Sequence, residues 1–294
     1  MLSLRFCALD RTIALDCSVD ELTEAFTAIC ATYRETSATA DVRYTVVCGE
    51  SFELWRDGCL LSSSAAAIDL AAAFELDLYE QLIAPLTGQW VLHAGAFAIG
   101  ENAVVVAGES GAGKSTITLA MLARGARYLS DEAALLDAVG GGSEEAPTVR
   151  GLPRPIGFSA ATLPKVLPDC VRRLGYAIRL ADERHAYHTL LHPRADAIEY
   201  RPLPLGTVVL LRPSSVSTAA RLVRYSKADA LTALWRHSIN PPNAASFAVA
   251  AHVCARTPVF YLESGGVDDA CAVLEKLAKS PSTVSADCLA ETGV

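Results

Sequence analysis

The chain has 294 residues, of which 51% are hydrophobic and 20% charged, with a formal net charge of −8. This composition is typical of a globular protein with a full core, and it excludes a disordered or collagen-like chain. The acidic balance argues against a nucleic-acid partner, because neutralising a phosphate backbone needs an excess of basic residues. A pocket for one phosphorylated small molecule needs only a few basic residues, so the net charge does not exclude it.

The cysteines and the N-terminal segment indicate the compartment. There are nine cysteines, an odd number, and no two have the C-x-x-C spacing, which disfavours a zinc ribbon or a disulfide framework. Arg5 and Asp10 interrupt the N-terminal segment too early for a secretory signal. No uncharged apolar stretch reaches the roughly 18 residues of a membrane span. We therefore predict a cytoplasmic protein with no membrane partner.

Residues 1–88 predict a small, β-rich α+β domain. Ser18 and Glu21 have the spacing of a capping box, and Leu22, Phe26 and Ile29 follow at helical spacing. Strands are predicted over 42–47, 52–55 and 59–61, with a turn at Asp57-Gly58 between the last two. The Ala- and Leu-rich stretch 65–84 predicts a helix that Pro85 ends.

Residues 89–279 predict an α/β domain, followed by a flexible tail over 280–294. Strands are expected over 90–99 and 103–107, the second being a continuous apolar run typical of a strand buried on both faces. A helix over 114–124 and a strand over 127–130 come next. Later elements are helices over 227–236, 244–255 and 267–277, strands over 207–211 and 259–262, and a glycine-rich surface loop over 140–145.

Residues 108–115 fit G-x-x-x-x-G-K-[ST], the P-loop motif, and are called the glycine loop below. Its glycines let main-chain N–H groups approach anionic oxygens, and the helix that follows points its positive end at the same place. Lys114 is predicted to reach the β- and γ-phosphates of ATP, and the Ser115 hydroxyl to contact Mg²⁺. The predicted phosphate-binding residues are Gly108, Glu109, Ser110, Gly111, Ala112, Gly113, Lys114, Ser115 and Thr116.

Asp131 and Glu132 follow the next predicted strand. The unit from 103 to 130 predicts a parallel crossover, so its two strands end at the same edge of the sheet and bring both carboxylates beside the phosphates. One carboxylate there can hold Mg²⁺ while the other orients and deprotonates an acceptor hydroxyl. This pattern favours phosphoryl transfer to an alcohol.

Three segments resemble one known family. They are L-H-A-G-A at 92–96, G-E-S-G-A-G-K-S-T at 108–116 and A-R-G-A-R-Y-L-S-D-E at 123–132. Together they are similar to the HPr kinase/phosphorylase family, and in particular to its stand-alone branch, which includes the kinases of lasso-peptide biosynthesis. The likeness extends to about residue 277 and implies a P-loop kinase domain of the HPr-kinase C-terminal type.

The resemblance also implies residue roles. Lys114 and Ser115 match the residues that bind ATP and Mg²⁺, and Asp131 matches the acid taken as the catalytic base. Glu132 replaces the usual second Asp and is assigned to catalysis and to Mg²⁺. His93 matches a histidine that hydrogen-bonds the acidic pair, and Arg154 an arginine that faces the phosphates.

Two departures bear on the acceptor. The segment 148–153 lacks most of the acidic signature tied to the phosphorylase reaction and to HPr, and residues 1–88 match no regulatory domain of the family. We therefore predict a kinase acting on a serine-type hydroxyl of a peptide or small protein, such as a precursor peptide in natural-product biosynthesis. The alternatives are a kinase of a small molecule resembling free serine, and a P-loop ATPase or nucleotide-binding module.

Three further patterns, of histidines, arginines and tryptophans, are weaker. His185, His188 and His192 share a helical face, which fits a zinc site or a solvated flap near the substrate. Arginines at 172, 173, 179 and 184 are expected to form a solvated face, or a dock for an acidic peptide or for the nucleotide phosphates. The isolated Trp residues are expected in the core, and an Ala-rich helix over 65–84 fits a homo-oligomer interface.

Overall fold

The computed structural model describes residues 1–138, 146–158, 177–179, 189–213, 220–264 and 266–279. They form two compact units. The first consists of residues 1–85 with short stretches between 154 and 195, and the second contains the glycine loop and most of the remaining chain. The domain predicted over 89–279 is thus divided, because the stretches around β12 (Ile156–Phe158), β13 (Ala177–Arg179) and β14 (Thr189–Leu191) group with the first unit.

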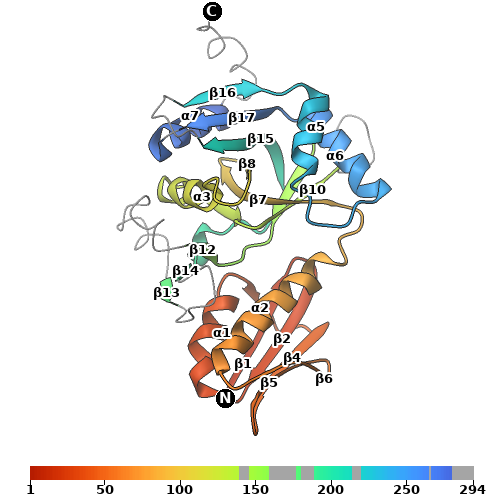
Figure 1. The fold of residues 1–294 in the computed structure, drawn as a ribbon, viewed down its shortest axis with the longest axis vertical. Helices are drawn as coiled ribbons and strands as arrows, with labels where there is room; N and C mark the ends of the chain where they lie inside the picture. Colours follow the sequence, from red (N-terminus) through yellow and green to blue (C-terminus); the bar gives the residue numbers. More distant parts are fainter. Residues whose placement is uncertain (139–145, 159–176, 180–188, 214–219, 265, 280–294) are drawn as a thin grey trace, which may run out of the picture. The chain divides into compact units, whose positions relative to one another are not determined.

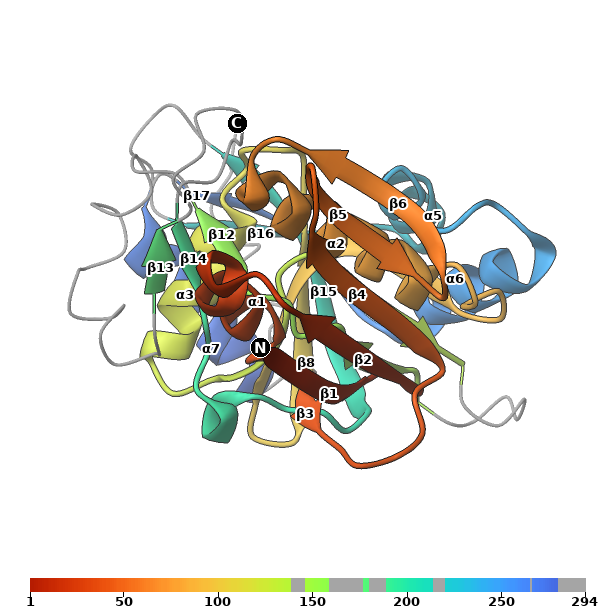
Figure 2. The ribbon, with the colours of Figure 1, turned by 90° about the horizontal axis from the view of Figure 1, so that it is seen from below.

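The first unit is a six-stranded sheet with two helices (Figure 2). Its strand order is β3-β1-β2-β4-β5-β6, and β12, β14 and β13 form a separate small sheet. Phe74 joins helix to sheet, because its ring meets those of Phe26 and Tyr44 edge-on. The elements are β1 (Leu2–Ala8), β2 (Arg11–Cys17), α1 (Thr23–Cys30), β3 (Arg34–Glu35), β4 (Val42–Cys48), β5 (Phe52–Arg56), β6 (Cys59–Ser64) and α2 (Ala67–Ile83).

Two local predictions in this unit have different outcomes. The Asp57-Gly58 turn between β5 and β6 is confirmed, with φ angles of 49° and 82° that suit a two-residue hairpin. The capping box is wrong. The Ser18 hydroxyl donates to the Val46 carbonyl instead, a 3-10 turn spans Asp20–Leu22, and α1 begins at Thr23. Ser18 still belongs to the β2–β4 pairing, since its main-chain N–H also donates to Val46.

The second unit is a mixed sheet between two pairs of helices (Figure 1). Helices α3 (Lys114–Ala123) and α7 (Val267–Lys279) pack together on one face, and α5 (Lys227–Trp235) and α6 (Ala244–Arg256) on the other. The strand order is β11-β10-β7-β8-β15-β17-β16, with β9 also paired to β7. The strands are β7 (Trp90–Ile99), β8 (Asn102–Ala107), β9 (Arg127–Ser130), β10 (Ala133–Asp137), β11 (Thr148–Gly151), β15 (Leu203–Pro213), β16 (Arg221–Arg224) and β17 (Val259–Ser264).

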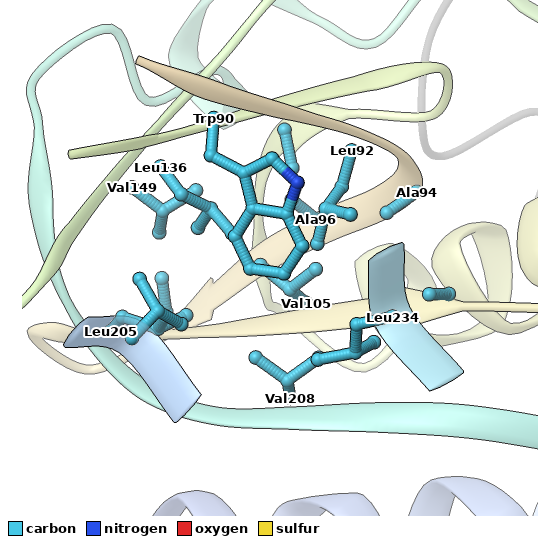
Figure 3. Close-up of a cluster of buried hydrophobic side chains, with 14 of the residues drawn as sticks. Trp90, Leu92, Ala94, Ala96, Val105, Leu136, Val149, Leu205, Val208 and Leu234 are labelled. Atoms are coloured by element: carbon cyan, nitrogen blue, oxygen red, sulfur yellow. The ribbon is translucent and has the colours of Figure 1, made fainter. Parts of the chain in front are cut away.

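The core under α5 and α6 is built from alternate residues of β7 (Figure 3). Trp90 is fully buried there and stacks on Trp235, with ring centroids 6.2 Å apart. Its indole N–H donates to the Ser238 hydroxyl at 2.7 Å. Trp90 is therefore core, as the sequence predicted, and the intervening residues of β7 face α3.

Strand β7 separates the two strands that carry the predicted site. β8 and β9 both run antiparallel to β7, so they are parallel to each other, as the crossover predicted. They are not neighbours, however, since β8 lies along one edge of β7 while β9 and β10 follow each other along the opposite edge. The glycine loop and the acidic pair therefore meet across β7.

The remaining elements are largely those the sequence predicts, with β10, β11 and β16 in addition. The loop over 140–145 and the tail over 280–294 lie outside the described residues. Within the described ranges, no helix is both long and apolar enough to cross a membrane. The cysteines in those ranges are free thiols at positions 7, 17, 30, 48, 59, 254 and 271.

Gly151 is fixed by the approach of β9 to β11. A Cβ atom at Gly151 would lie 2.0 Å from the Leu129 carbonyl oxygen and 2.2 Å from its carbon, which are main-chain atoms that cannot swing away. Gly151→Ala should lower the free energy of unfolding by about 1–3 kcal/mol or more, measured by chemical denaturation.

Gly88→Ala is the control for that substitution. A Cβ atom there meets nothing within 4 Å. Its free energy of unfolding should stay unchanged or rise by about 0.4–1 kcal/mol, because alanine restricts the unfolded chain. Equal stability of the two variants would contradict the close packing of β9 on β11.

Candidate active site

The glycine loop connects the carboxyl end of β8 to the first residue of α3, as the sequence predicted. Gly111 and Gly113 have φ angles of 78° and 100°, a region that favours glycine. Gly108 is needed for space, because a Cβ atom there would lie 3.1 Å from the Ala112 Cβ and 3.3 Å from the Leu211 carbonyl oxygen. The loop therefore holds a shape that residues with side chains would strain.

Lys114 lies inside the loop with only 7% of its surface exposed. Its ammonium donates to the carbonyl oxygens of Gly108 at 2.9 Å and Glu109 at 3.2 Å. Burial lowers the pKa of Lys114, while the carboxylates of Glu132, Asp131 and Glu109 oppose that shift. The cation is thus held at the centre of the loop, within electrostatic range of the acidic pair.

Ser130 shapes the junction between β9 and β10 where the acidic pair lies. Its buried hydroxyl donates to the Leu152 carbonyl at 2.9 Å. The same oxygen accepts the N–H groups of Glu132 at 3.3 Å and Ala133 at 2.9 Å. Asp131 and Glu132 thus lie between the two stretches paired to β7, and Glu132 keeps one bond to that strand, its carbonyl accepting the Ala94 N–H at 3.3 Å. Ser130 therefore acts as a positioning residue for the two acids.

Gly95 lets the two halves of the site approach each other. A Cβ atom at Gly95 would lie 2.4 Å from the Thr118 hydroxyl oxygen, 3.7 Å from Asp131 Oδ1 and 3.8 Å from the Lys114 carbonyl oxygen. Helix α3 and Asp131 therefore converge over one residue of β7 that has no side chain. The structure thus brings Lys114 and Asp131 together, as the sequence predicted.

His93 contacts the second acid of the pair. Its Nδ1 lies 3.0 Å from Glu132 Oε2, and both side chains are partly exposed. The predicted pairing of this histidine with the acidic pair is therefore present at Glu132. Asp131 is the more enclosed acid, with 4% of its surface exposed.

Arg154 and His192 belong to the first unit. The Arg154 guanidinium lies 2.8 Å from a carboxylate oxygen of Glu75 and over the Tyr79 ring, so its role toward phosphates stays a prediction. Burial lowers the pKa of His192 to about 4, which keeps its ring neutral. His185, His188 and the arginines at 172, 173 and 184 lie outside the described residues, as does the side chain of Arg179.

The donor set at the acidic pair fits Mg²⁺. Ser115 offers a hydroxyl, and Asp131 and Glu132 offer carboxylates, all of them the oxygen ligands this ion prefers. The described residues contain no cluster of three His, Cys, Asp or Glu side chains suited to a metal.

Two pockets flank the glycine loop. One, of about 450 Å³, lies against the amino ends of α3 and α7 and is lined by Gly113, Thr116, Ser264 and Asp268. The other, of about 400 Å³, is lined by Glu109, Arg212, Tyr261 and His237. Each has the size of a small-molecule site.

Sequence reasoning missed four residues of this site. The four are Gly95, Thr118, Ser130 and His237. A serine before two acids was a signal for Ser130, since its hydroxyl commonly bonds main chain two or three residues on. The other three carry no local signal, because their neighbours come from distant parts of the chain.

The chain matches no protein-family model and no curated protein. A search of solved structures finds similarity to the HPr(Ser) kinase/phosphatase from Coxiella burnetii, with 11% sequence identity and a TM-score of 0.32. The alignment covers 65% of this chain and 95% of that one.

Crowding at Gly95 gives a testable coupling. Gly95→Ala should destabilise the protein by about 1–3 kcal/mol, because the new Cβ atom overlaps the Thr118 hydroxyl. Thr118→Ala removes that hydroxyl, so the double variant should lose less than the sum of the two single losses. A double-mutant cycle of unfolding free energies measures this coupling. Additive losses would show that the two residues do not meet.

Proposed function

We propose that this protein is an ATP-dependent kinase that transfers the γ-phosphoryl group to a serine-type hydroxyl. The observation that carries the proposal is the convergence over Gly95, where Asp131 lies within 4 Å of the position that also borders Lys114. A buried ammonium, a loop with glycines at positive φ and a helix amino end suit a polyphosphate. Carboxylates at the same place suit proton removal from an alcohol.

Binding begins at the glycine loop. The Lys114 ammonium exchanges its bonds to the Gly108 and Glu109 carbonyls for bonds to the β- and γ-phosphate oxygens. The main-chain N–H groups of the loop and the amino end of α3 add partial positive charge. Ser115 and Glu132 are the residues that we assign to Mg²⁺, which would neutralise phosphate charge when bound.

Transfer follows as an in-line displacement. The acceptor oxygen forms a bond to the γ-phosphorus, the bond from that phosphorus to the β,γ-bridging oxygen breaks, and ADP leaves with the electron pair. The hydroxyl proton passes to a carboxylate, which we assign to Asp131 because it faces α3 and Lys114. Glu132 is the alternative base, since 31% of its side chain is exposed and His93 holds it in place.

The acceptor we propose is a hydroxyl on a peptide or small protein. The likeness to stand-alone HPr-kinase relatives supports it, together with the loss of the acidic signature in 148–153. A flexible chain can bring a side-chain hydroxyl into a site beside the glycine loop. The same loss makes HPr a poor acceptor and favours the forward reaction.

Lys114→Ala and Asp131→Asn should separate binding from chemistry. Lys114→Ala should weaken both ATP binding and turnover, because the ammonium contacts phosphate before and during transfer. Asp131→Asn keeps the shape of the side chain and removes the base, so ATP should bind while transfer falls by about 10²–10⁴-fold. Calorimetric titration measures the first quantity and labelled-phosphate transfer the second.

Glu132→Gln is the matched control, because it removes the neighbouring charge and leaves Asp131 intact. A smaller loss than that of Asp131→Asn would support Asp131 as the base. If Asp131→Asn transferred phosphate at nearly the wild-type rate while Glu132→Gln did not, the base would be Glu132.

The acceptor class is tested with labelled ATP and three additions: no acceptor, free serine, and serine-containing peptides. Phosphopeptide formation well above the other two reactions is the expected result. Rapid turnover of free serine would identify a small-molecule kinase. Phosphate release that no acceptor changes would identify an ATPase.

A further inference from the structure

A second histidine lies beside the phosphate site. Strand β8 leaves the edge of β7 after the Ala94–Ala107 pair, where the glycine loop begins. The segment 237–239 takes the vacated edge. His93 N–H donates to the His237 carbonyl at 2.8 Å, and Ile239 N–H donates to the Val91 carbonyl at 2.8 Å.

This pairing places the main chain of His237 beside that of His93. Leu92 and Ser238 form an antiparallel bridge, so His93 and His237 stand directly opposite each other. His237 itself lies in the turn after α5, where its N–H donates to the Leu234 carbonyl at 2.9 Å, and its side chain lines the pocket beside Glu109. His93 lies on the face toward α3, because its neighbour Leu92 is in the core under α5 and α6.

Glu132, His93 and His237 therefore follow one another across β7, beside the glycine loop. Glu132 contacts His93 at 3.0 Å, and His237 follows on the far edge of β7. His237 is half-buried and lines the 400 Å³ pocket together with Gly108 and Glu109. Burial lowers its pKa, Glu109 opposes that shift, and Lys114, His93 and Arg236 add to it.

A neutral imidazole has one N–H donor. Within the described ranges, no hydrogen bond involves the ring nitrogens of His237. The hydrogen bonds of this residue are made by its main chain. We propose that His237 is a further catalytic residue, which donates a hydrogen bond to the γ-phosphoryl group of the nucleotide held by the glycine loop. This inference rests on the proposed kinase function and adds a residue to its site.

The γ-phosphoryl group is the assigned partner because His237 lies on the His93 side of the loop, where the acidic pair receives the acceptor. A contact to that group distinguishes ATP from ADP. The test therefore compares the dissociation constants of ADP and of a non-hydrolysable ATP analogue, each with Mg²⁺, by calorimetry on the full chain.

His237→Ala should weaken binding of the ATP analogue by about 10-fold or more, the usual cost of losing a hydrogen bond to a charged group. ADP binding should stay at the wild-type value. His237→Gln, which keeps an N–H donor, should recover part of the loss. His252→Ala on α6 is the matched control and should change neither constant, because His252 lines neither of the two pockets flanking the loop.

The main-chain bonds to β7 survive every one of these substitutions, so the melting temperatures should agree within a few degrees. Equal weakening of ADP and the analogue, or no weakening, would overturn the role of His237 while leaving the kinase proposal in place. If the wild-type protein bound neither nucleotide, the proposed function would fail and this inference with it.

Discussion

Close approach over Gly95 is the constraint on which the site depends. Strand β7 lies between the strand that feeds the glycine loop and the strands that hold the acidic pair. A side chain at this position would push α3 away from the sheet, since the Thr118 hydroxyl occupies the place of a Cβ atom. With hydrogen alone there, Lys114 and Asp131 approach from opposite edges of one strand. The atom of Lys114 that borders Gly95 is its main-chain carbonyl oxygen, and its ammonium separately lies within electrostatic range of Asp131 and Glu132.

Main-chain bonding along the two edges of β7 organises the remaining residues. One edge carries β8 and then the segment 237–239, and the other carries β9 and then β10. On each edge, β7 changes its partner beside the site. The glycine loop leaves the sheet on one edge, and the turn at Ser130 holds Asp131 and Glu132 between β9 and β10 on the other. His93 contacts both edges, because its main-chain N–H donates to His237 and its side chain contacts Glu132. The sheet thus presents these polar groups where its regular pairing stops.

Much of the local structure could be predicted from the sequence because its causes are local. The apolar run at 103–107, the glycines of the loop and the helix-forming stretch after Lys114 act within a few residues of one another. The Asp57-Gly58 hairpin turn also has a local cause, since both residues adopt positive φ angles. The capping box failed for a reason of tertiary origin, since the Ser18 hydroxyl bonds Val46 on a neighbouring strand. A side chain that can cap a helix is also able to bond a strand, and only the fold decides between them.

By itself the sequence determined the glycine loop, the identity of the acids and the order of strand, loop, helix and strand. These depend on residue type and spacing, which the chain carries along its length. The tertiary structure decided that β7 separates β8 from β9, that Gly95 provides the point of convergence, and that His237 stands opposite His93. Each of these depends on hydrogen bonding and packing between residues distant in the chain. Such pairings leave no periodicity or motif in the sequence, because they form only when the whole sheet packs between its helices.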